Sequence, residues 1–347
     1  MSHCRSASLF LIAALAVSAA PIAHGAPKPK ATPKKPAQPG VRGTQQMAGA
    51  QGAFGETYTL KSGFNFTLVS AEYSLSRVSA QETLYADAGD KLLVLHYRIK
   101  NSAKDDMFFD RSVHTLNAID SKGEGHTGGS IIGRTSTGAA IEPTLKPGQG
   151  YNDCYTAIKV PAQGAVAKLI LNQGRLHTSE DVIRYTIGEG KNAIAPLPDY
   201  ARDPADPSGD SVLAQIPAKL GVSYPLQETD LTLEKVEFTD QPIRDSAPDD
   251  GKRYLVATVL IKNQTSDELG LYVSMFTAKI ANADGDTFDS KGLLRTNSDE
   301  NLDAKLKSGG TYRARWYFSV PKDGSLKTII IAESESHQYT FDISNVK

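Results

Sequence analysis

The stretch that decides the fold is Asp90–Asn101, DKLLVLHYRIKN, because a closely similar stretch, GKRYLVATVLIKN, recurs at Gly251–Asn263. A second pair follows, with LKPGQGYNDCYTAIKVP at Leu145–Pro161 and LKSGGTYRARWYFSVP at Leu306–Pro321. An internal repeat fixes the unit of folding, and at about 130 residues this unit is far longer than a solenoid repeat. We infer a duplicated domain.

The repeated stretch has the pattern of a β-strand. Large apolar residues fall at every second position in both copies, which is the period of a strand with one face in a core. The core-facing set is Leu93, Leu95, Tyr97 and Ile99 in the first copy, and Leu255, Ala257, Val259 and Ile261 in the second. Many short strands separated by turn residues, with no twelve-residue amphipathic helix, predict an all-β chain of two tandem immunoglobulin-like antiparallel β-sandwich domains.

Two details predict local geometry. The stretch from Tyr151 to Pro161 has one residue more than its counterpart from Tyr312 to Pro321, and an extra residue in one strand indicates a β-bulge. Asp284-Gly285 lies between two strand-like runs, 272–281 and 286–288, and predicts a two-residue hairpin turn.

The first residues predict export. Arg5 precedes the apolar run Ala7–Ala20, and Ala23-His24-Gly25 is a small-x-small cleavage site before Ala26. The run is too short to span a membrane. Cys4 precedes the run instead of ending it, so we expect no lipid anchor. The mature chain is therefore predicted to be extracytoplasmic, either periplasmic or secreted, with no integral membrane span.

The predicted organisation follows from these features and from proline-rich breaks. Residues 1–25 are a signal peptide, 26–55 a Pro/Lys-rich disordered linker, 56–188 the first sandwich, 189–214 an interdomain linker, and 215–347 the second sandwich. The lysines of 26–55 either contact an anionic envelope surface or belong to a solvated spacer.

Overall charge gives no sign of a nucleic-acid partner, since 38 Lys and Arg residues stand against 39 Asp and Glu. Cleavage of the signal peptide leaves Cys154 as the single cysteine, so no internal disulfide is available. Cys154 is either a reactive thiol or a small buried apolar residue, and its strand position on one face with Thr156 and Ile158 favours burial.

The motifs of the repeat resemble the immunoglobulin-like domain of unknown function found in many bacterial lipoproteins and secreted proteins, related to secreted mycobacterial immunogenic proteins. The motifs are Lys100-Asn101, Pro147-Gly148 and Val160-Pro161 in the first copy, and Lys262-Asn263, Asp284-Gly285, Gly309 and Val320-Pro321 in the second. The resemblance covers about residues 57–187 and 220–343. It implies the sandwich fold and no common activity.

Residues that could carry chemistry do not form a recognisable set. The histidines outside the signal peptide are too far apart in sequence to predict a zinc site: His96, His114, His126, His177 and His337. Asn282-Ala-Asp284-Gly-Asp286 resembles part of a calcium loop but lacks the downstream glutamate. Ser130 lies among glycines without a nucleophile elbow. We predict no catalytic, cofactor or metal residues, no cofactor, and a ligand-binding site that the sequence leaves unknown.

The aromatic strand Trp316-Tyr317-Phe318 allows two interpretations. Trp316 and Phe318 are expected in the core. Tyr317 on the other face could join Tyr254 and Tyr272 in an exposed platform for sugar rings.

These observations favour an exported, non-catalytic interaction module that binds an unknown protein or glycan of the cell envelope, with an oligomeric state left open. The alternatives are a structural spacer or self-assembling subunit and, last, a hydrolytic enzyme with a non-standard site.

Overall fold

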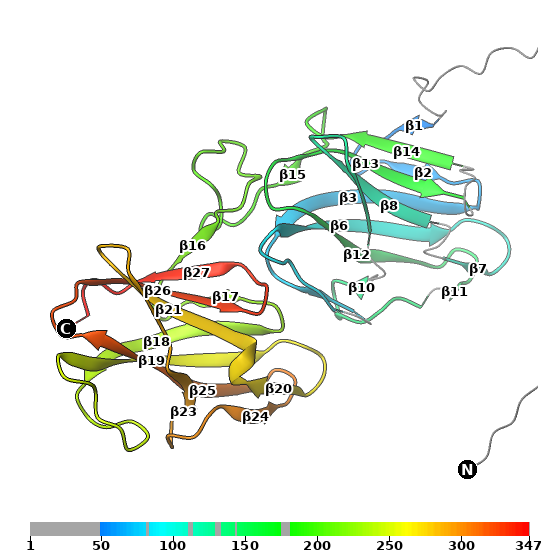
Figure 1. The fold of residues 1–347 in the computed structure, drawn as a ribbon. Coiled ribbons are helices and arrows are strands. Elements are labelled where there is room, and N and C mark those ends of the chain that lie inside the picture. Colours follow the sequence, from blue (N-terminus) through cyan, green and yellow to red (C-terminus); the bar gives the residue numbers. More distant parts are fainter. Residues whose placement is uncertain are drawn as a thin grey trace, which may run out of the picture. The chain divides into compact units, whose positions relative to one another are not determined.

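The computed structural model describes residues 49–80, 83–109, 114–128, 133–142, 144–174 and 181–346. The fold is all-β and consists of two tandem immunoglobulin-like sandwiches (Figure 1). The described residues contain one short helix, the 3₁₀ turn Val273–Met275. Both sandwiches lie within the compact unit 47–347.

In the first sandwich one sheet has the strand order β1-β14-β13-β8-β9 and the other β10-β12-β6-β3-β15, with β2 paired to β3. The strands of the first sheet are β1 (Ala50–Gln51), β14 (Asp181–Thr186), β13 (Val166–Gln173), β8 (His114–Asp120) and β9 (Gly125–Thr127). Those of the second are β10 (Gly133–Arg134), β12 (Gly150–Pro161), β6 (Asp90–Asn101), β3 (Phe64–Ser74), β15 (Ile194–Ala195) and β2 (Thr57–Thr59). Small ribbons lie beside them: β4 (Val78–Ser79) with β5 (Thr83–Leu84), and β7 (Met107–Phe108) with β11 (Thr144–Leu145).

The second sandwich repeats this arrangement, with the sheets β16-β27-β26-β21-β22 and β17-β18-β19-β25-β23. The first sheet contains β16 (Gln215–Ala218), β27 (Gln338–Asp342), β26 (Leu326–Glu333), β21 (Phe276–Asn282) and β22 (Thr287–Asp289). The second contains β17 (Ser223–Pro225), β18 (Thr229–Thr239), β19 (Lys252–Asn263), β25 (Thr311–Pro321) and β23 (Gly292–Arg295), while β20 (Leu269–Tyr272) pairs with β24 (Asp303–Leu306). In its described residues, no strand corresponds to β15.

The predicted core strands are confirmed as β6 and β19, each at the centre of its sheet between two long antiparallel neighbours. All eight predicted core residues are buried. The opposite register is also buried in part, because further segments cover it. Leu92 and Val94 are buried in β6, and in β19 Tyr254 and Val256 pack with Ile243.

The predicted bulge is confirmed. The register between β12 and β6 shifts between Tyr151 and Cys154, whereas β25 pairs with β19 without a break. The hairpin at Asp284-Gly285 is also present, joining β21 to β22, but its connection is longer than two residues. The Asn282 N–H donates to the Asp286 carbonyl, and Gly285 has a φ of 91°.

The Lys-Asn motif has a structural reason that is the same in both copies. The Asn101 side chain is fully buried, and its Nδ2 donates to the carbonyls of Asp105 and Leu145 at 2.8 Å each. The Asn263 amide does the same with Asp267 and Leu306, also at 2.8 Å. Each asparagine thereby ties the end of the central strand to two loops.

The segments predicted to join the domains are partly structured. β1 lies inside the predicted linker 26–55 and pairs in parallel with β14, so this end of the segment belongs to the first sandwich. Within 189–214, β15 pairs in parallel with β3, and Leu197, Ala201 and Val212 are buried. The segment is therefore packed on the first sandwich through β15, and Tyr200 within it also contacts Tyr224 of the second sandwich. The signal peptide and residues 26–48 lie outside the described residues, and the exact domain boundaries remain a prediction.

Replacing the buried asparagine should destabilise the fold. Asn263→Ala removes the side-chain donor of the buried Leu306 carbonyl and one of the donors of the partly buried Asp267 carbonyl, so we expect the free energy of unfolding to fall by about 2–4 kcal/mol in urea denaturation. Asn297→Ala, at an exposed turn position, is the matched control and should stay within about 0.5 kcal/mol of the parent protein. Equal effects in the two variants would contradict the role assigned to Asn263.

Candidate functional site

The structure scatters the histidines that it describes. His96 pairs with Glu72 at 3.2 Å and His126 with Asp120 at 3.1 Å, while His337 Nε2 donates to the Asp90 carbonyl at 2.7 Å. No group of three or more metal-ligating side chains occurs within the described residues. His177 and Ser130 lie outside those residues. The described histidines therefore do not come together in space to form a shared metal site.

The expected burial of Cys154, Trp316 and Phe318 is confirmed. Cys154 is fully buried, and burial raises the pKa of its thiol to about 12, which suppresses the reactive thiolate. The His114 ring is buried and stacks on Phe109 at 4.8 Å. Trp316 and Phe318 lie in the core.

The predicted aromatic platform is wrong. Tyr254 and Tyr317 do meet, with ring centroids 5.6 Å apart, but both are buried together with Ile243 and Leu294. Tyr272 is 49% exposed and belongs to β20, where it lies over Gly270. The segment that follows β18 covers the outer face of the sheet, and no alternation pattern in the sequence indicates this cover.

In the loop that resembles a calcium site, the side-chain oxygen of Asn282 is engaged in hydrogen bonds of the loop itself. Asn282 Oδ1 accepts the N–H groups of Asp284 and Asp286 at 3.0 and 2.8 Å. This hydrogen bonding is typical of an asparagine that closes a turn.

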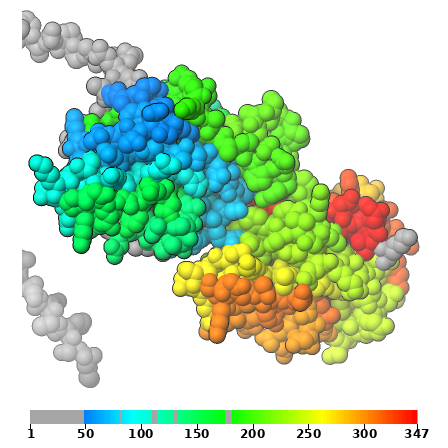
Figure 2. Space-filling view, turned by 180° about the vertical axis from the view of Figure 1, so that it is seen from behind, coloured from blue at the N-terminus to red at the C-terminus, as the bar shows by residue number. Residues whose placement is uncertain are grey.

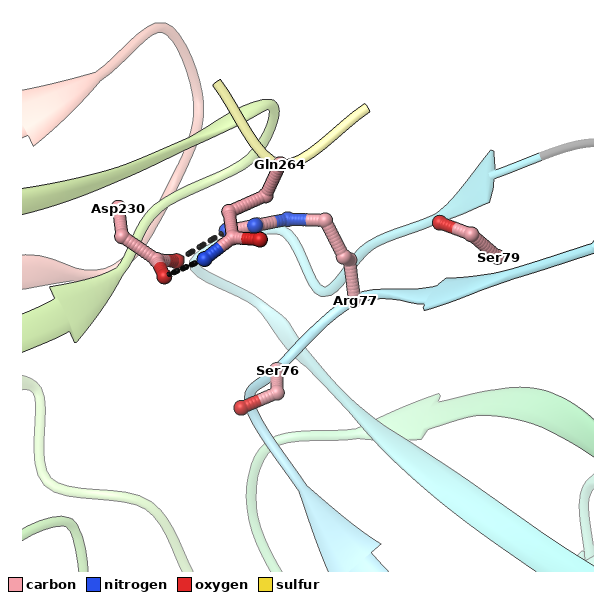
Figure 3. Close-up of a pocket in the computed structure, with 5 residues that line it drawn as sticks. All are labelled: Ser76, Arg77, Ser79, Asp230 and Gln264. Atoms are coloured by element: carbon pink, nitrogen blue, oxygen red, sulfur yellow. Dashed lines mark hydrogen bonds and ion pairs between the residues drawn. The ribbon is translucent and has the colours of Figure 1, made fainter. Parts of the chain in front are cut away.

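One polar cavity of about 350 Å³ is lined by residues of both sandwiches: Ser76, Arg77, Ser79, Asp230 and Gln264 (Figure 3). Arg77 comes from the loop after β3 and points toward Asp230 on β18. Its guanidinium donates to Asp230 Oδ1 at 2.7 Å and to the carbonyls of Gln227 and Thr229 at 2.8 Å each. The side chain is 8% exposed. These contacts make Arg77 a clamp between the sandwiches.

Further hydrogen bonds extend this clamp. The Ala88 N–H donates to the Glu335 carbonyl at 2.8 Å, and Gln227 Nε2 donates to Asp87 Oδ1 at 2.8 Å. His337 donates to Asp90 beside them, and burial lowers the pKa of its imidazole. Because these donors and acceptors satisfy one another, we assign the contact a structural role.

A different feature is shared by both sandwiches: a cation stacked on an aromatic ring at the start of the central strand. In the first sandwich Lys91 Nζ lies 4.4 Å from the centroid of the Tyr73 ring. In the second, the guanidinium carbon of Arg253 lies 3.4 Å from the centroid of the Phe238 ring. The register makes these pairs equivalent, since Tyr73 lies opposite Leu93 and Phe238 opposite Leu255. Such contacts gain strength when they are shielded from water.

The surroundings of the two cations differ. Lys91 is fully buried, and its Nζ donates to the carbonyls of Ala162, Gly164 and Asp210. Asp210 belongs to the segment that follows the first sandwich. Burial lowers the pKa of Lys91 to about 8 although Asp210 acts in the opposite direction. The lysine is therefore enclosed by carbonyl oxygens.

Arg253 borders a cavity of about 260 Å³ at one end of the second sandwich. The cavity walls come from Phe238, the β25–β26 connection and the residues after β27, and consist of Phe238, Arg253, Ala283, Gly324, Ser325, Leu326, Lys327, Ile343, Ser344 and Val346. In Figure 2 the red surface near the end of the chain lies beside yellow-green surface of the second sandwich. The Arg253 Nε–H is buried and has no hydrogen-bond partner within the described chain. A buried donor without a partner, at the border of a cavity with both polar and apolar walls, is a candidate to hold a ligand atom.

The sequence did not predict this site, because an arginine in an apolar strand has neither the residue type nor the spacing of a metal or catalytic motif. A usable signal was present: both copies place a cation at the second position of an otherwise apolar strand, Lys91 in DKLLVL and Arg253 in the equivalent KRYLVA. The aromatic partners lie far away in sequence, so the pairing itself needed the structure.

Comparison with known domain families gives one match. Residues 218–339 match the model of a family described as a domain of unknown function, DUF4352. The match spans most of the second sandwich. The resemblance drawn from the repeat motifs is confirmed there, and the DUF4352 match contains the Arg253 cavity residues from Phe238 to Lys327. A comparison with curated proteins gives no match.

Several solved structures are similar over about one sandwich. An uncharacterized β-sandwich protein from Clostridium difficile 630 is 16% identical, over 37% of this chain and 93% of that one, with a TM-score of 0.29. The secreted protein MPT63 from Mycobacterium tuberculosis is 14% identical, over 37% and 97%, with a TM-score of 0.30. A putative lipoprotein, ycdA, from Bacillus subtilis is 14% identical, over 35% and 38%, with a TM-score of 0.27. No function is transferred from them.

Removing the clamp should loosen the contact between the sandwiches. In Arg77→Ala the Asp230 carboxylate and the carbonyls of Gln227 and Thr229 each lose one donor, and Asp230 also loses its ion-pair partner, so we expect the free energy of unfolding to fall by about 2–4 kcal/mol. Hydrogen exchange at the Ala88 amide should become faster. Arg98→Ala, at an exposed position of β6, should change neither quantity, and an unchanged Ala88 amide in Arg77→Ala would contradict the clamp.

Lys91 should produce a measurable pH dependence of stability. Its pKa is about 8 in the folded chain and 10.5 for a lysine exposed to water, as in the unfolded chain, so between these values the unfolded state binds more protons. The free energy of unfolding of the parent protein should therefore rise, relative to Lys91→Met, as the pH increases from about 8 to 10.5. A constant difference between the two proteins over this range would show that Lys91 titrates normally.

Proposed function

We propose that the protein is an extracytoplasmic, non-catalytic interaction module whose binding site is the Arg253 cavity of the second sandwich. The observation that carries the proposal is the Arg253 side chain at the border of this cavity, because its buried Nε–H has no hydrogen-bond partner among the described residues. An unsatisfied buried donor is costly, and a ligand acceptor would remove that cost. The proposed partner is a protein or glycan of the cell envelope.

The signal-like first residues support the proposed location outside the cytoplasm. No helix of the described chain has the length and apolar character needed to cross a membrane.

The described side chains favour binding over catalysis. Ser62 Oγ and His114 Nε2 lie 3.4 Å apart, within reach of a serine–histidine hydrogen bond. The His114 ring is held between Phe64 and Phe109, with centroids at 5.4 and 4.8 Å, in a packing role. A general base must reach a proton of a bound substrate, and this ring is enclosed by its neighbours.

The test compares ligand capture by three purified chains spanning residues 26–347. The parent protein, Arg253→Met and the control Arg98→Met are immobilised, exposed to envelope extract and, separately, to a glycan array. We expect the parent protein and Arg98→Met to retain the same component and Arg253→Met to lose it, with rebinding of that component after purification. Retention of nothing, or equal retention by all three chains, would overturn the proposal.

A second candidate, self-assembly, is favoured by one observation: residues Val236 and Glu237 of β18 have no neighbouring strand on their outer side among the described residues. Open strand edges can pair with other chains. Light scattering decides between the candidates, because assembly through this edge requires the mass of the particle to increase with protein concentration.

A further inference from the structure

In the first sandwich, the place equivalent to the Arg253 cavity is occupied by the chain itself. β15 adds to the outer edge of β3 as a parallel strand, with Ile194 opposite Ala71 and Ala195 opposite Glu72 (Figure 1). The same segment then returns to the cation. Asp210 supplies a carbonyl to Lys91, and the Val212 N–H donates to the Ala162 carbonyl at 2.9 Å.

This occupant is bound by both backbone and side-chain contacts. The Gly164 N–H donates to Ser211 Oγ at 3.0 Å, and Gln163 Nε2 donates to the Val212 carbonyl at 2.7 Å. Leu197 and Val212 are buried, with 0% and 1% of their surface exposed. The two ends of the segment, residues 194–195 and 210–212, therefore bind the first sandwich as an intramolecular peptide, while Tyr200 between them packs on Tyr224 of the second sandwich with ring centroids 5.4 Å apart.

The second sandwich has the same strand edge and a cation at the same position, but no described segment of the chain lies on them. By register, Ala71 and Glu72 correspond to Val236 and Glu237 of β18, because the two pairs lie opposite equivalent residues of β6 and β19. In the same way Lys91 corresponds to Arg253. Tyr73 is buried under the segment, whereas its counterpart Phe238 is only half-buried. The difference between the copies lies in what covers the shared cation.

Charge indicates which kind of peptide fits. The occupant of the first sandwich is acidic and carries Asp199, Asp203, Asp206 and Asp210 against the single base Arg202. The cavity of the second sandwich presents Arg253 and the exposed Lys327. Opposite charges favour association and orient the partner.

We propose that the second sandwich binds an extended acidic peptide of a partner protein, which adds as a parallel strand to β18 at Val236–Glu237. This inference rests on the proposed function and names its ligand. A backbone or carboxylate oxygen of the peptide accepts from Arg253 Nε, and an apolar side chain enters the cavity beside Phe238 and Leu326. The backbone bonds give affinity, and the cavity and Arg253 give selectivity.

The peptide of residues 193–212, AIAPLPDYARDPADPSGDSV, is the probe, because it fits the equivalent place in the first sandwich. Fluorescence anisotropy measures its binding to the full mature chain, residues 26–347. The first sandwich already holds its own copy at high effective concentration, so a free peptide should bind the second. We expect saturable binding that Arg253→Met weakens about tenfold or more and that Arg98→Met leaves unchanged.

Two further measurements exclude unfolding and other modes of binding. Circular dichroism must show that Arg253→Met is folded, and hydrogen exchange must show protection of residues 235–238 when the peptide is bound. Exchanging the four aspartates of the peptide for asparagine should also weaken binding. Equal binding by the parent protein and Arg253→Met, or protection elsewhere, would overturn the inference.

The outcomes separate this inference from the proposed function. If the peptide does not bind while envelope capture still depends on Arg253, the site is a binding site for a different ligand and the peptide inference is wrong. If the parent protein neither captures an envelope component nor binds the peptide, the proposed function is wrong as well. If Arg253→Met abolishes a concentration-dependent dimer, the occupant is a second copy of the chain, which also overturns the partner-peptide inference.

Discussion

The buried ammonium group of Lys91 determines where the chain goes after the first sandwich. A lysine with no exposed surface needs oxygen partners, and one of its three carbonyls comes from Asp210, beyond the last strand of the sandwich. The segment that leads to Asp210 must therefore return across the sheet. In doing so it adds β15 to the edge of β3 and buries Leu197 and Val212. One buried charge thus fixes the path between the two sandwiches.

The second sandwich contains the same cation–aromatic pair without this cover. Arg253 stacks on Phe238, but its Nε–H has no partner, and the outer edge of β18 beside it is unpaired in the described part of the chain. Arginine is suited to such a place because its planar guanidinium stays charged, stacks on rings and presents several donors in fixed directions. The two copies therefore share the cation–aromatic pair and the adjoining strand edge, and they differ in what covers them.

The sequence predicted the strands, the core register and the bulge because each depends on local order. Alternating apolar residues identified β6 and β19, and one extra residue identified the bulge of β12. The repeated asparagines were visible as a motif, but their hydrogen bonds to distant loops were not. The packed path of residues 194–212 was hidden for a different reason. Its prolines and aspartates are typical of a linker, and its contacts with Lys91 join residues far apart in the chain.

The candidate site was harder to predict from sequence. Aligning the two copies singles out the residues that differ, whereas the candidate site depends on residues that the copies share. His96, His114 and Cys154 have no chemical equivalent in the second copy, and the structure gives them pairing or packing roles. Lys91 and Arg253 are equivalent residues and look like part of the scaffold. Their difference is one of burial and partners, which depends on tertiary structure. The candidate site thus lies where the cation–aromatic pair is covered by the chain in the first copy but not by any described segment in the second.

The most direct test of this account is to give the second sandwich an occupant. Residues 188–212 are fused after Ile343, in place of residues 344–347, because Ile343 and Ile187 hold equivalent positions and donate to equivalent carbonyls. A segment that binds the folded state stabilises it by mass action. The account predicts that the fusion raises the free energy of unfolding of the second sandwich, and that Arg253→Met removes the increase. No increase, or the same increase in Arg253→Met, would contradict it.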